Sequence, residues 1–199
     1  AEMCKLVENA SRDSNIDFAN KLSVICDTAN IDVFELIRLA NHHPRVNILK
    51  PGPGVGGHCI AVDPWFIVSE FPEESKLIKL ARNINDDKTN WVIQKVLDKV
   101  GHFEVEKKKK PLVACLGLSF KPNIDDLRES PALHVVLELL KADINVRAVE
   151  PNIRTHPSIN LYSLPEALDV ADIVVILVAH NQFKDIPLKE DYLIFCDLS

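Results

Sequence analysis

The hydrophobic pattern of this chain changes its period near residue 104, and that change predicts two parts with different folds. From residue 1 to about residue 100, apolar residues recur at helical spacing. From residue 112 onward, short continuous apolar runs alternate with helical segments, as in a parallel sheet covered by helices. The charged stretch 104–111 is expected to be a solvated linker. We predict an all-α domain over residues 1–103, followed by an α/β doubly wound (Rossmann-like) parallel-sheet domain over residues 111–199.

Individual elements follow from the same patterns. In the first part we expect helices over 1–29, from Asp32 to Pro44, and over 73–100. Along the first helix the expected packing residues are Leu6, Ala10, Phe18, Leu22, Ile25 and Ala29. In the second part the expected strands are 112–120, 145–149, 172–178 and 192–196, and the expected helices are 130–141 and 164–170.

A glycine-rich stretch precedes one of the five cysteines. Four of the six glycines lie between Gly52 and Gly57, directly before Cys59. Glycine is favoured where the backbone takes a positive φ or comes close to another group. Asp63 follows four residues after Cys59, so a helical turn would bring its carboxylate near the thiol. A nucleophile, backbone N–H donors and a carboxylate are the components of covalent carbonyl chemistry.

Two other interpretations of this stretch stay open. Gly52-x-Gly54-x-x-Gly57 matches the dinucleotide-binding fingerprint in letters, but Pro51 precedes it where a strand should end and Pro64 follows soon after. A lone cysteine is usually inert core filling, and a glycine-rich turn is often only a turn. Spacing alone therefore leaves a reactive Cys59 and a structural Cys59 about equally supported.

Charged side chains form two further candidate groups. Lys5, Asn9 and Arg12 lie at i, i+4 and i+7, so they share one face of the first helix, as a functional group or as a solvated stripe. Lys121 and Arg128 lie in the loop after the first expected strand, where ligands of doubly wound sheets bind. They could contact phosphate or carboxylate groups through their side chains. A surface loop with self-paired charges is the alternative.

Composition excludes several classes of protein. The net charge is −6 and no basic stripe is interleaved with aromatics, so we expect no nucleic-acid partner. No apolar run is long enough to span a bilayer and no signal peptide is evident, so no membrane association is expected. The five cysteines are scattered without a C-x-x-C pair, which favours reduced thiols and a cytoplasmic location. The seven histidines show no ligand spacing, and no metal site is predicted.

Three segments carry a family resemblance: AEMCKLVEN at residues 1–9, GPGVGGHCIAVDP at 52–64 and GLSFKPNIDDLRESP at 117–131. In this order and spacing, the chain resembles the central and C-terminal parts of the UDP-glucose/GDP-mannose dehydrogenase family over essentially its whole length. Within the family, NHHPRVNILKPGPGVGGHCIAVDPWFIV most resembles the enzymes that oxidise UDP-N-acetyl-D-mannosamine. UDP-glucose 6-dehydrogenases are the alternative.

The resemblance implies an activity and a site. Family members oxidise a sugar C6 hydroxyl to a carboxylate with two NAD, and the products of the resembling group enter bacterial surface polysaccharides. It implies that Cys59 forms a thiohemiacetal and then a thioester, that Lys5 acts in acid–base or oxyanion chemistry, and that Asn9 and Asp63 hold the hydrolytic water. Arg128 matches a contact to NAD. The implied contacts to the UDP-sugar are Lys5, Asn9, Arg12, His43, Arg45, Gly56, Phe120 and Lys121.

The resemblance also implies a homodimer formed through the long first helix, with Arg45 reaching the partner's site. The chain is expected to be a fragment that lacks the NAD-binding N-terminal domain, to be the substrate-binding and dimerisation part, and to be inactive alone. The rival class is a non-catalytic nucleotide-sugar-binding and dimerisation module.

Overall fold

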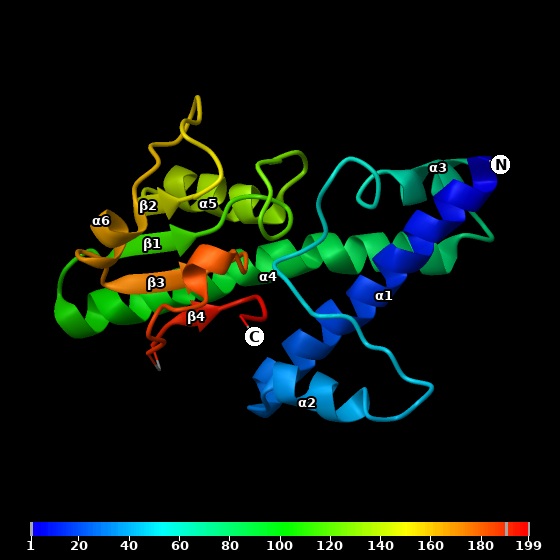
Figure 1. Ribbon diagram of the computed structural model, residues 1–199, viewed down its shortest axis with the longest axis horizontal. Coiled ribbons are helices and arrows are strands. Elements are labelled where there is room, and N and C mark those ends of the chain that lie inside the picture. The colour runs from blue at the N-terminus through cyan, green and yellow to red at the C-terminus, as the bar shows by residue number, and fades with distance from the viewer. Residues whose placement is uncertain (1, 190, 199) are drawn as a thin grey trace.

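The structure is a computed structural model that describes residues 2–189 and 191–198. The expected domain ends at residues 1 and 199 lie outside this range. A group of helices, α1 (Glu2–Ala29), α2 (Val33–Ala40) and α3 (Asp63–Glu70), lies beside a four-stranded sheet, and the long helix α4 (Lys76–Lys107) runs through both (Figure 1). The predicted order of a helical part followed by a sheet with helices is confirmed.

Local signals place the helix ends. The Asp32 carboxylate accepts hydrogen bonds from the backbone N–H groups of Phe34 and Glu35, at 2.8 and 3.3 Å, and so caps α2 as expected. Helix α1 ends where Asn30 takes the left-handed conformation, φ 55°, which lets the N–H of Ile31 bond to the carbonyl of Cys26 at 2.8 Å.

The face of α1 that packs on the rest of the chain is small and polar. Its buried residues are Asn9, Ala10, Asp13, Ala19, Asn20, Ser23 and Cys26. The expectation that Phe18, Ile25 and Ala29 pack inward is wrong: Phe18 and Ile25 are 55% and 54% exposed, and Ala29 is exposed as well. The inward face carries hydrogen-bonding groups that α4 satisfies, so the larger apolar side chains point away from it.

A buried polar network joins α1 to α4. Arg82 Nη1 and Asn85 Nδ2 each donate to Asp13 Oδ1 at 2.8 Å, and Asn20 Nδ2 donates to Asn85 Oδ1 at 2.8 Å. Burial raises the pKa of Asp13 although the Arg82 guanidinium opposes this. Sliding one helix along the other would separate Arg82 from Asp13 and leave a buried charge without a partner, which is costly in free energy. The network therefore favours a single register between α1 and α4.

Helix α4 is longer than predicted and belongs to both parts. It continues to Lys107, past the expected boundary at residue 103, and ends where Lys108 takes a left-handed φ of 56°. The expected linker 104–111 therefore shrinks to a few residues. Val92, Val96 and Val100 on the second half of α4 pack in the core of the sheet domain. Leu77, near the start of α4, is 71% exposed.

The sheet is fully parallel. Strands β1 (Leu112–Leu116), β2 (Asn145–Val149), β3 (Ile173–Ile176) and β4 (Leu193–Ile194) have the order β2-β1-β3-β4. All four expected strands are present, and three are shorter than their apolar runs. Helix α5 (Pro131–Lys141) begins at its N-cap Ser130, and the short α6 (Leu164–Leu168) begins with a capping box formed by Ser163 and Glu166.

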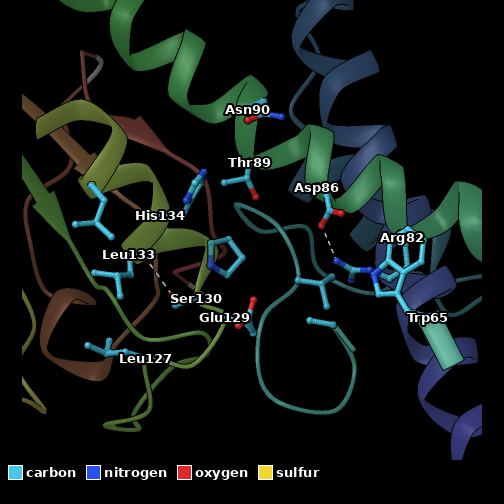
Figure 2. Close-up of a pocket in the computed structure, with 14 residues that line it drawn as sticks. Trp65, Arg82, Asp86, Thr89, Asn90, Leu127, Glu129, Ser130, Leu133 and His134 are labelled. Carbon is cyan, nitrogen blue, oxygen red and sulfur yellow. Dashed lines mark hydrogen bonds and ion pairs between the residues drawn. The ribbon is translucent and has the colours of Figure 1, made fainter. Parts of the chain in front are cut away.

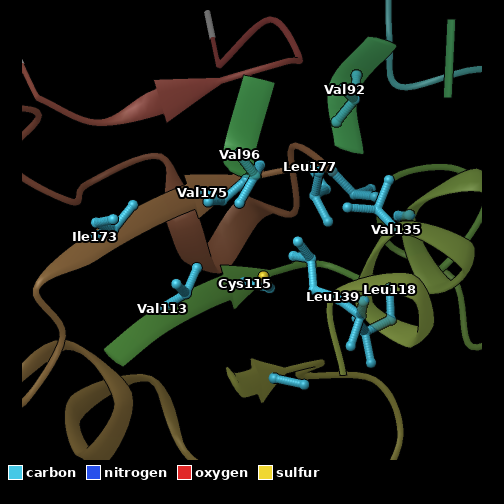
Figure 3. Packing of buried hydrophobic residues seen from close by; sticks show 14 of the residues in the cluster. Val92, Val96, Val113, Cys115, Leu118, Val135, Leu139, Ile173, Val175 and Leu177 are labelled. Atoms are coloured by element: carbon cyan, nitrogen blue, oxygen red, sulfur yellow. The ribbon is translucent and has the colours of Figure 1, made fainter. Parts of the chain in front are cut away.

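Helices cover both faces of the sheet. Val113 and Cys115 of β1 point to the face covered by α4 and α5, where they meet residues such as Val96 and Leu139 (Figure 3). Ala114 and Leu116, one residue out of phase, point to the other face, with α6 and the 3₁₀ turn η1 (Asn181–Phe183). This confirms the predicted doubly wound arrangement.

One buried lysine of α4 lies where α1 and the sheet domain meet. Lys88 is 4% exposed, donates to Ser23 Oγ at 2.7 Å, and holds its ammonium 3.7 Å from the centre of the Trp91 ring. Burial lowers the pKa of Lys88 to about 7, even though nearby Asp27 favours the charged form. The folded protein therefore releases this proton more readily than the unfolded chain does.

We predict that Lys88 makes stability rise with pH. Between pH 7 and about 10 the unfolded chain keeps the Lys88 proton and the folded protein does not, so raising the pH favours folding. The free energy of unfolding of wild type, relative to Lys88→Met, should increase by roughly 2–3 kcal/mol from pH 7 to 9.5. Urea unfolding at both pH values measures this, with exposed Lys79→Met as the matched control. A pH-independent difference would contradict the prediction.

Candidate functional site

The glycine loop, residues 52–57, packs directly against the loop that follows β1. A Cβ on Gly56 would lie 2.4 Å from the carbonyl oxygen of Glu129 and 2.8 Å from Cβ of Phe120. A Cβ on Gly57 would lie 3.0 Å from the Phe120 ring, and Gly57 also needs a positive φ of 87°. Its N–H donates to the carbonyl of Arg128 at 3.1 Å. These glycines thus allow two backbone segments, about 70 residues apart in sequence, to touch.

The longer segment from Gly52 to Asp63, which contains this loop, is hydrogen-bonded to helices at both of its ends. Asn20 Oδ1 on α1 accepts from the Gly52 N–H at 2.9 Å, and Thr89 Oγ1 on α4 donates to the Pro53 carbonyl at 2.9 Å. At the far end, Asn9 Nδ2 donates to Asp63 Oδ2 at 2.6 Å. The segment that carries Cys59 therefore spans between two fixed points on α1.

The helical turn expected after Cys59 is present. The N–H of Asp63 donates to the Cys59 carbonyl at 2.7 Å, and the N–H of Val62 donates to the same oxygen at 3.1 Å. This turn leads into α3, whose Ile67 and Val68 are buried. The thiol of Cys59 is partly exposed, unlike that of Cys115, whose pKa burial raises to about 12. The partly exposed Cys59 lies at the start of this turn, where a ligand can reach it, and the Asn9–Asp63 pair lies at the end of the same turn.

A cavity of about 300 Å³ opens where this loop meets the carboxyl end of the sheet. Residues 50–54, which lead into the glycine loop, line it together with Phe120 and Lys121. Residues 177–179, which follow β3, also line it. The Lys121 ammonium lies 5.7 Å from the centre of the Phe120 ring. An aromatic ring, an exposed cation and backbone at strand ends suit a planar, anionic ligand such as a nucleotide.

Arg128, at the end of the loop after β1, is held by a carboxylate. Its Nε and Nη2 atoms donate to Asp126 at distances of 2.6–3.1 Å, while the side chain stays 63% exposed. These hydrogen bonds lower the pKa of Asp126 to about 2. The alternative of a surface loop whose charges pair with one another therefore holds for Arg128 and Asp126. The Arg128 guanidinium still faces solvent.

The structure divides the predicted site residues into groups. Asn9 meets Asp63 next to the Cys59 turn, and Gly56 meets Phe120 beside Lys121. The others lie on the surface: Lys5 pairs with Glu8 at 3.2 Å, and Arg12, His43, Arg45 and Arg128 are exposed. The remaining contacts expected among these residues stay predictions.

A second cavity, of about 490 Å³, lies between α4, α5 and the segment 55–65, which contains Cys59 (Figure 2). Figure 2 shows Arg82 pairing with Asp86 on one side, and Glu129 and His134 on the other. Both signs of charge line it, and none of the predicted site residues does. The cavity therefore lies next to the candidate site, but neither Cys59 nor Lys121 lines it.

Sequence reasoning missed the residues that hold the site in place. Asn20, Asn85 and Thr89 support the glycine loop through the contacts above, and buried Glu150 and His180 support the loop after β1. A signal existed for both groups. Asn85 shares the buried stripe of α4 with Ala81 and Val92, and Glu150 directly follows a strand. Polar residues at inward positions or at strand ends mark such supports.

The described part of the chain has neither a metal-binding cluster nor a membrane-spanning helix. Within residues 2–189 and 191–198, no group of three or more His, Cys, Asp or Glu side chains is arranged to hold a metal ion. No helix in the described part of the chain has both the length and the apolar character needed to cross a bilayer.

Known proteins resemble this chain in sequence and in structure. UDP-N-acetyl-D-mannosamine dehydrogenase of Campylobacter jejuni is 53% identical over an alignment of 204 residues. The alignment covers 98% of this chain and 49% of that protein. NDP-N-acetyl-D-galactosaminuronic acid dehydrogenase of Ralstonia nicotianae is 54% identical over 189 residues, 92% of this chain and 44% of that protein. The solved structure of a UDP-D-ManNAc dehydrogenase from Pyrococcus horikoshii superposes with a TM-score of 0.84 at 32% identity, covering 98% of this chain and 51% of that one.

The chain thus spans about half the length of the curated relatives it matches. Its two parts correspond to two domains of one family. The central domain of the UDP-glucose/GDP-mannose dehydrogenase family matches residues 1–87, and the UDP binding domain of that family matches residues 114–194. The central-domain match falls on the helical part, and the UDP-binding-domain match falls on the sheet part. The chain therefore belongs to the UDP-glucose/GDP-mannose dehydrogenase family.

Proposed function

We propose that this chain is the central and UDP-binding part of an NAD-dependent dehydrogenase that oxidises C6 of UDP-N-acetyl-D-mannosamine to the carboxylate. The observation that carries the proposal is the contact between two loops. The glycine loop leads to a partly exposed Cys59, and it packs on the loop that presents Phe120 and Lys121. A thiol for the sugar and an aromatic–cation pair for the nucleotide thus belong to one assembly.

The proposed chemistry uses Cys59 as the nucleophile. Loss of a hydride and a proton from the C6 alcohol gives an aldehyde, and the Cys59 thiolate adds to its carbon to form a thiohemiacetal. A second hydride loss converts this adduct to a thioester. Lys5 is proposed to stabilise the oxygen that becomes negative in these steps. Its ion pair with Glu8 is exposed on both sides and therefore restrains the ammonium only weakly.

Hydrolysis is proposed to use the Asn9–Asp63 pair. Asp63 Oδ2 accepts from Asn9, which leaves the carboxylate with lone pairs that can accept from a water molecule beside the Cys59 turn. Attack of that water on the thioester carbon releases the Cys59 thiolate and the uronic acid. Gly56, Arg12, His43 and Arg45 are proposed as further contacts to the UDP-sugar, the last across a dimer. The product is proposed to serve surface polysaccharide synthesis.

Two NAD molecules, bound one after the other, would each accept one hydride. Among the described residues, only Arg128 is assigned to it, and its exposed guanidinium suits a phosphate contact. The glycine loop does not supply a dinucleotide site, because it follows no strand and its glycines face Phe120, Glu129 and Pro131. This chain is therefore proposed to contribute one edge of the cofactor site.

An apolar stripe on α1 supports the proposed homodimer. Met3, Val7, Phe18 and Ile25 are each about half exposed, at 47%, 51%, 55% and 54%. Their spacings of four, eleven and seven residues place them on one side of the helix. Burying this stripe against a second α1 would remove it from water.

A first prediction of the proposed function concerns the nucleophile. Cys59→Ala in the full-length enzyme should abolish production of the uronic acid, because no thioester can form without the sulfur. Acid production is measured by chromatography of the UDP-sugar after incubation with NAD. The matched control is Cys4→Ala, which removes an exposed thiol from α1 and should leave the rate unchanged. Near-normal acid production by Cys59→Ala would exclude the covalent route.

A second prediction concerns ligand binding by this chain alone. The chain should bind UDP through the cavity beside Phe120 and Lys121, and Lys121→Ala should weaken this binding. It should not bind NAD usefully, because one charge-assisted hydrogen bond from Arg128 contributes about 1.5–3 kcal/mol, less than the roughly 4 kcal/mol that millimolar binding requires. Calorimetry with both ligands on one preparation measures this. Micromolar NAD binding would show that the cofactor site is misplaced.

A third prediction concerns the dimer. Phe18→Glu places a charge in the middle of the exposed stripe on α1 and should convert a dimer to a monomer in sedimentation velocity experiments. Exposed Thr28→Glu, near the end of the same helix, is the matched control for added charge. A dimer that survives Phe18→Glu would place the interface elsewhere.

A further inference from the structure

Two buried side chains, Glu150 and His180, accept hydrogen bonds from the backbone of the loop after β1. In Figure 1, β1, β2 and β3 point the same way, so the residues that follow them gather at one edge of the sheet. Glu150 follows β2 and is 4% exposed, while His180 follows β3 and is 0% exposed. Neither can touch a ligand in the cavity, and both contact the backbone of the loop that presents Phe120 and Lys121.

Glu150 holds the start of this loop. Its Oε2 atom accepts from the backbone N–H groups of Leu118 and Ser119, at 2.8 and 3.1 Å, and contacts His180 Nε2 at 3.0 Å. Burial opposes ionisation of Glu150, but the hydrogen bonds from His180, Leu118 and Asn152 together lower its pKa. The carboxylate is therefore charged and acts as an acceptor for every one of these donors.

The partners of His180 fix which ring nitrogen carries the proton. The Asn123 backbone N–H lies 2.9 Å from Nδ1, and Asn152 Nδ2 lies 3.1 Å from the same atom. Both groups can only donate, so Nδ1 must be an acceptor without a proton. Nε2 then carries the hydrogen and donates it to Glu150. His180 is thus a neutral imidazole that passes a hydrogen-bond chain from the carboxylate to the far end of the loop.

The cluster contains Ser119, His180 and Glu150, the residue types of a hydrolytic triad, but its geometry serves another purpose. Ser119 Oγ and Glu150 both approach the same nitrogen, Nε2, and the Ser119 hydroxyl donates to the Lys121 carbonyl at 2.8 Å. In a triad the serine and the acid bind opposite nitrogens. Here the groups bond to the backbone on both sides of Phe120 and Lys121 instead.

We propose that His180 is a positioning residue for the nucleotide-sugar site: its unprotonated Nδ1 anchors the Asn123 N–H and so holds Phe120 and Lys121 in a binding-ready arrangement. Asn123 takes a left-handed φ of 62°, a conformation that asparagine adopts more readily than most other residues. Its side chain is tied as well, since Asn123 Oδ1 accepts from the Asn181 N–H at 2.9 Å. The proposal rests on the UDP-sugar function above and adds a residue that no ligand contacts.

Two substitutions separate the two ring nitrogens. In His180→Asn the amide oxygen falls near the position of Nδ1, so the Asn123 N–H keeps an acceptor while the bond to Glu150 is lost. In His180→Gln the amide NH₂ falls near Nε2, so the bond to Glu150 is kept while the Asn123 N–H loses its acceptor. Asn152→Ala is the matched control, because it removes the other donor to Nδ1 and leaves the Asn123 contact intact.

The expected result is that His180→Asn and Asn152→Ala bind UDP nearly as wild type does, while His180→Gln binds it about tenfold more weakly. Amide hydrogen exchange without ligand should show faster exchange of Asn123 in His180→Gln only. Equal UDP affinity and equal exchange in the Asn and Gln variants would overturn the proposal.

Two readouts keep the test independent of variant folding and of the proposed function. Nitrogen-15 NMR of wild type should show a bare Nδ1 and a protonated Nε2 on His180, and a proton on Nδ1 would overturn the proposal without any substitution. If wild type fails to bind UDP, the proposed function fails, while the exchange and tautomer measurements still decide the role of His180.

Discussion

The absence of side chains at Gly54, Gly56 and Gly57 is the constraint on which the site depends. Any Cβ at Gly54 would meet Thr89 Oγ1 at 2.4 Å, and one at Gly56 would meet the Glu129 carbonyl at the same distance. A side chain at either position would therefore push the glycine loop away from α4 and from the loop after β1. Since Cys59 lies on one of these loops and Phe120 on the other, their separation is set by contacts that only glycine permits.

Polar groups, rather than apolar packing, set where α1 lies. The larger apolar side chains of α1 face outward, and its inner face holds Asn9, Asp13 and Asn20. Each has a directional hydrogen-bond partner on α3, on α4 or in the glycine loop. Apolar packing tolerates small shifts along a helix, whereas hydrogen bonds of 2.6–2.9 Å do not. These hydrogen bonds therefore fix the position of α1, the helix that carries the candidate catalytic residues Lys5 and Asn9.

The sequence predicted the sheet well and the packing of α1 poorly, for one physical reason. Strands such as residues 112–116 and 173–176 are buried on both faces, so apolar character alone marks them. On α1, apolar character pointed to Phe18 and Ile25, because the pattern does not distinguish a face that meets α4 from a face that meets solvent or a second subunit. The end of α4 was missed because charged residues 104–107 are compatible with both a helix and a linker.

For the candidate site, the sequence indicated the glycine motif and the loop after β1, but it did not indicate the residues that hydrogen-bond to these two segments. Asn85 and His180 act through contacts with backbone from distant parts of the chain. No local pattern records such contacts, although buried polar residues at strand ends are a usable clue. His43 and Arg45 were proposed through resemblance alone, and their exposed positions show why local pattern could not find them.

The continuity of α4 has a consequence for how the chain folds. Its first half, with Ala81 and Asn85, belongs to the helical part, and its second half, with Val92 and Val96, belongs to the sheet core. When one core opens, its half of this 32-residue helix loses the packing that stabilises it, and the helix turns that enter the other core lose a neighbouring hydrogen-bonded turn. We therefore expect the two parts to unfold in one cooperative transition. The boundary that composition draws between them is not a boundary of folding.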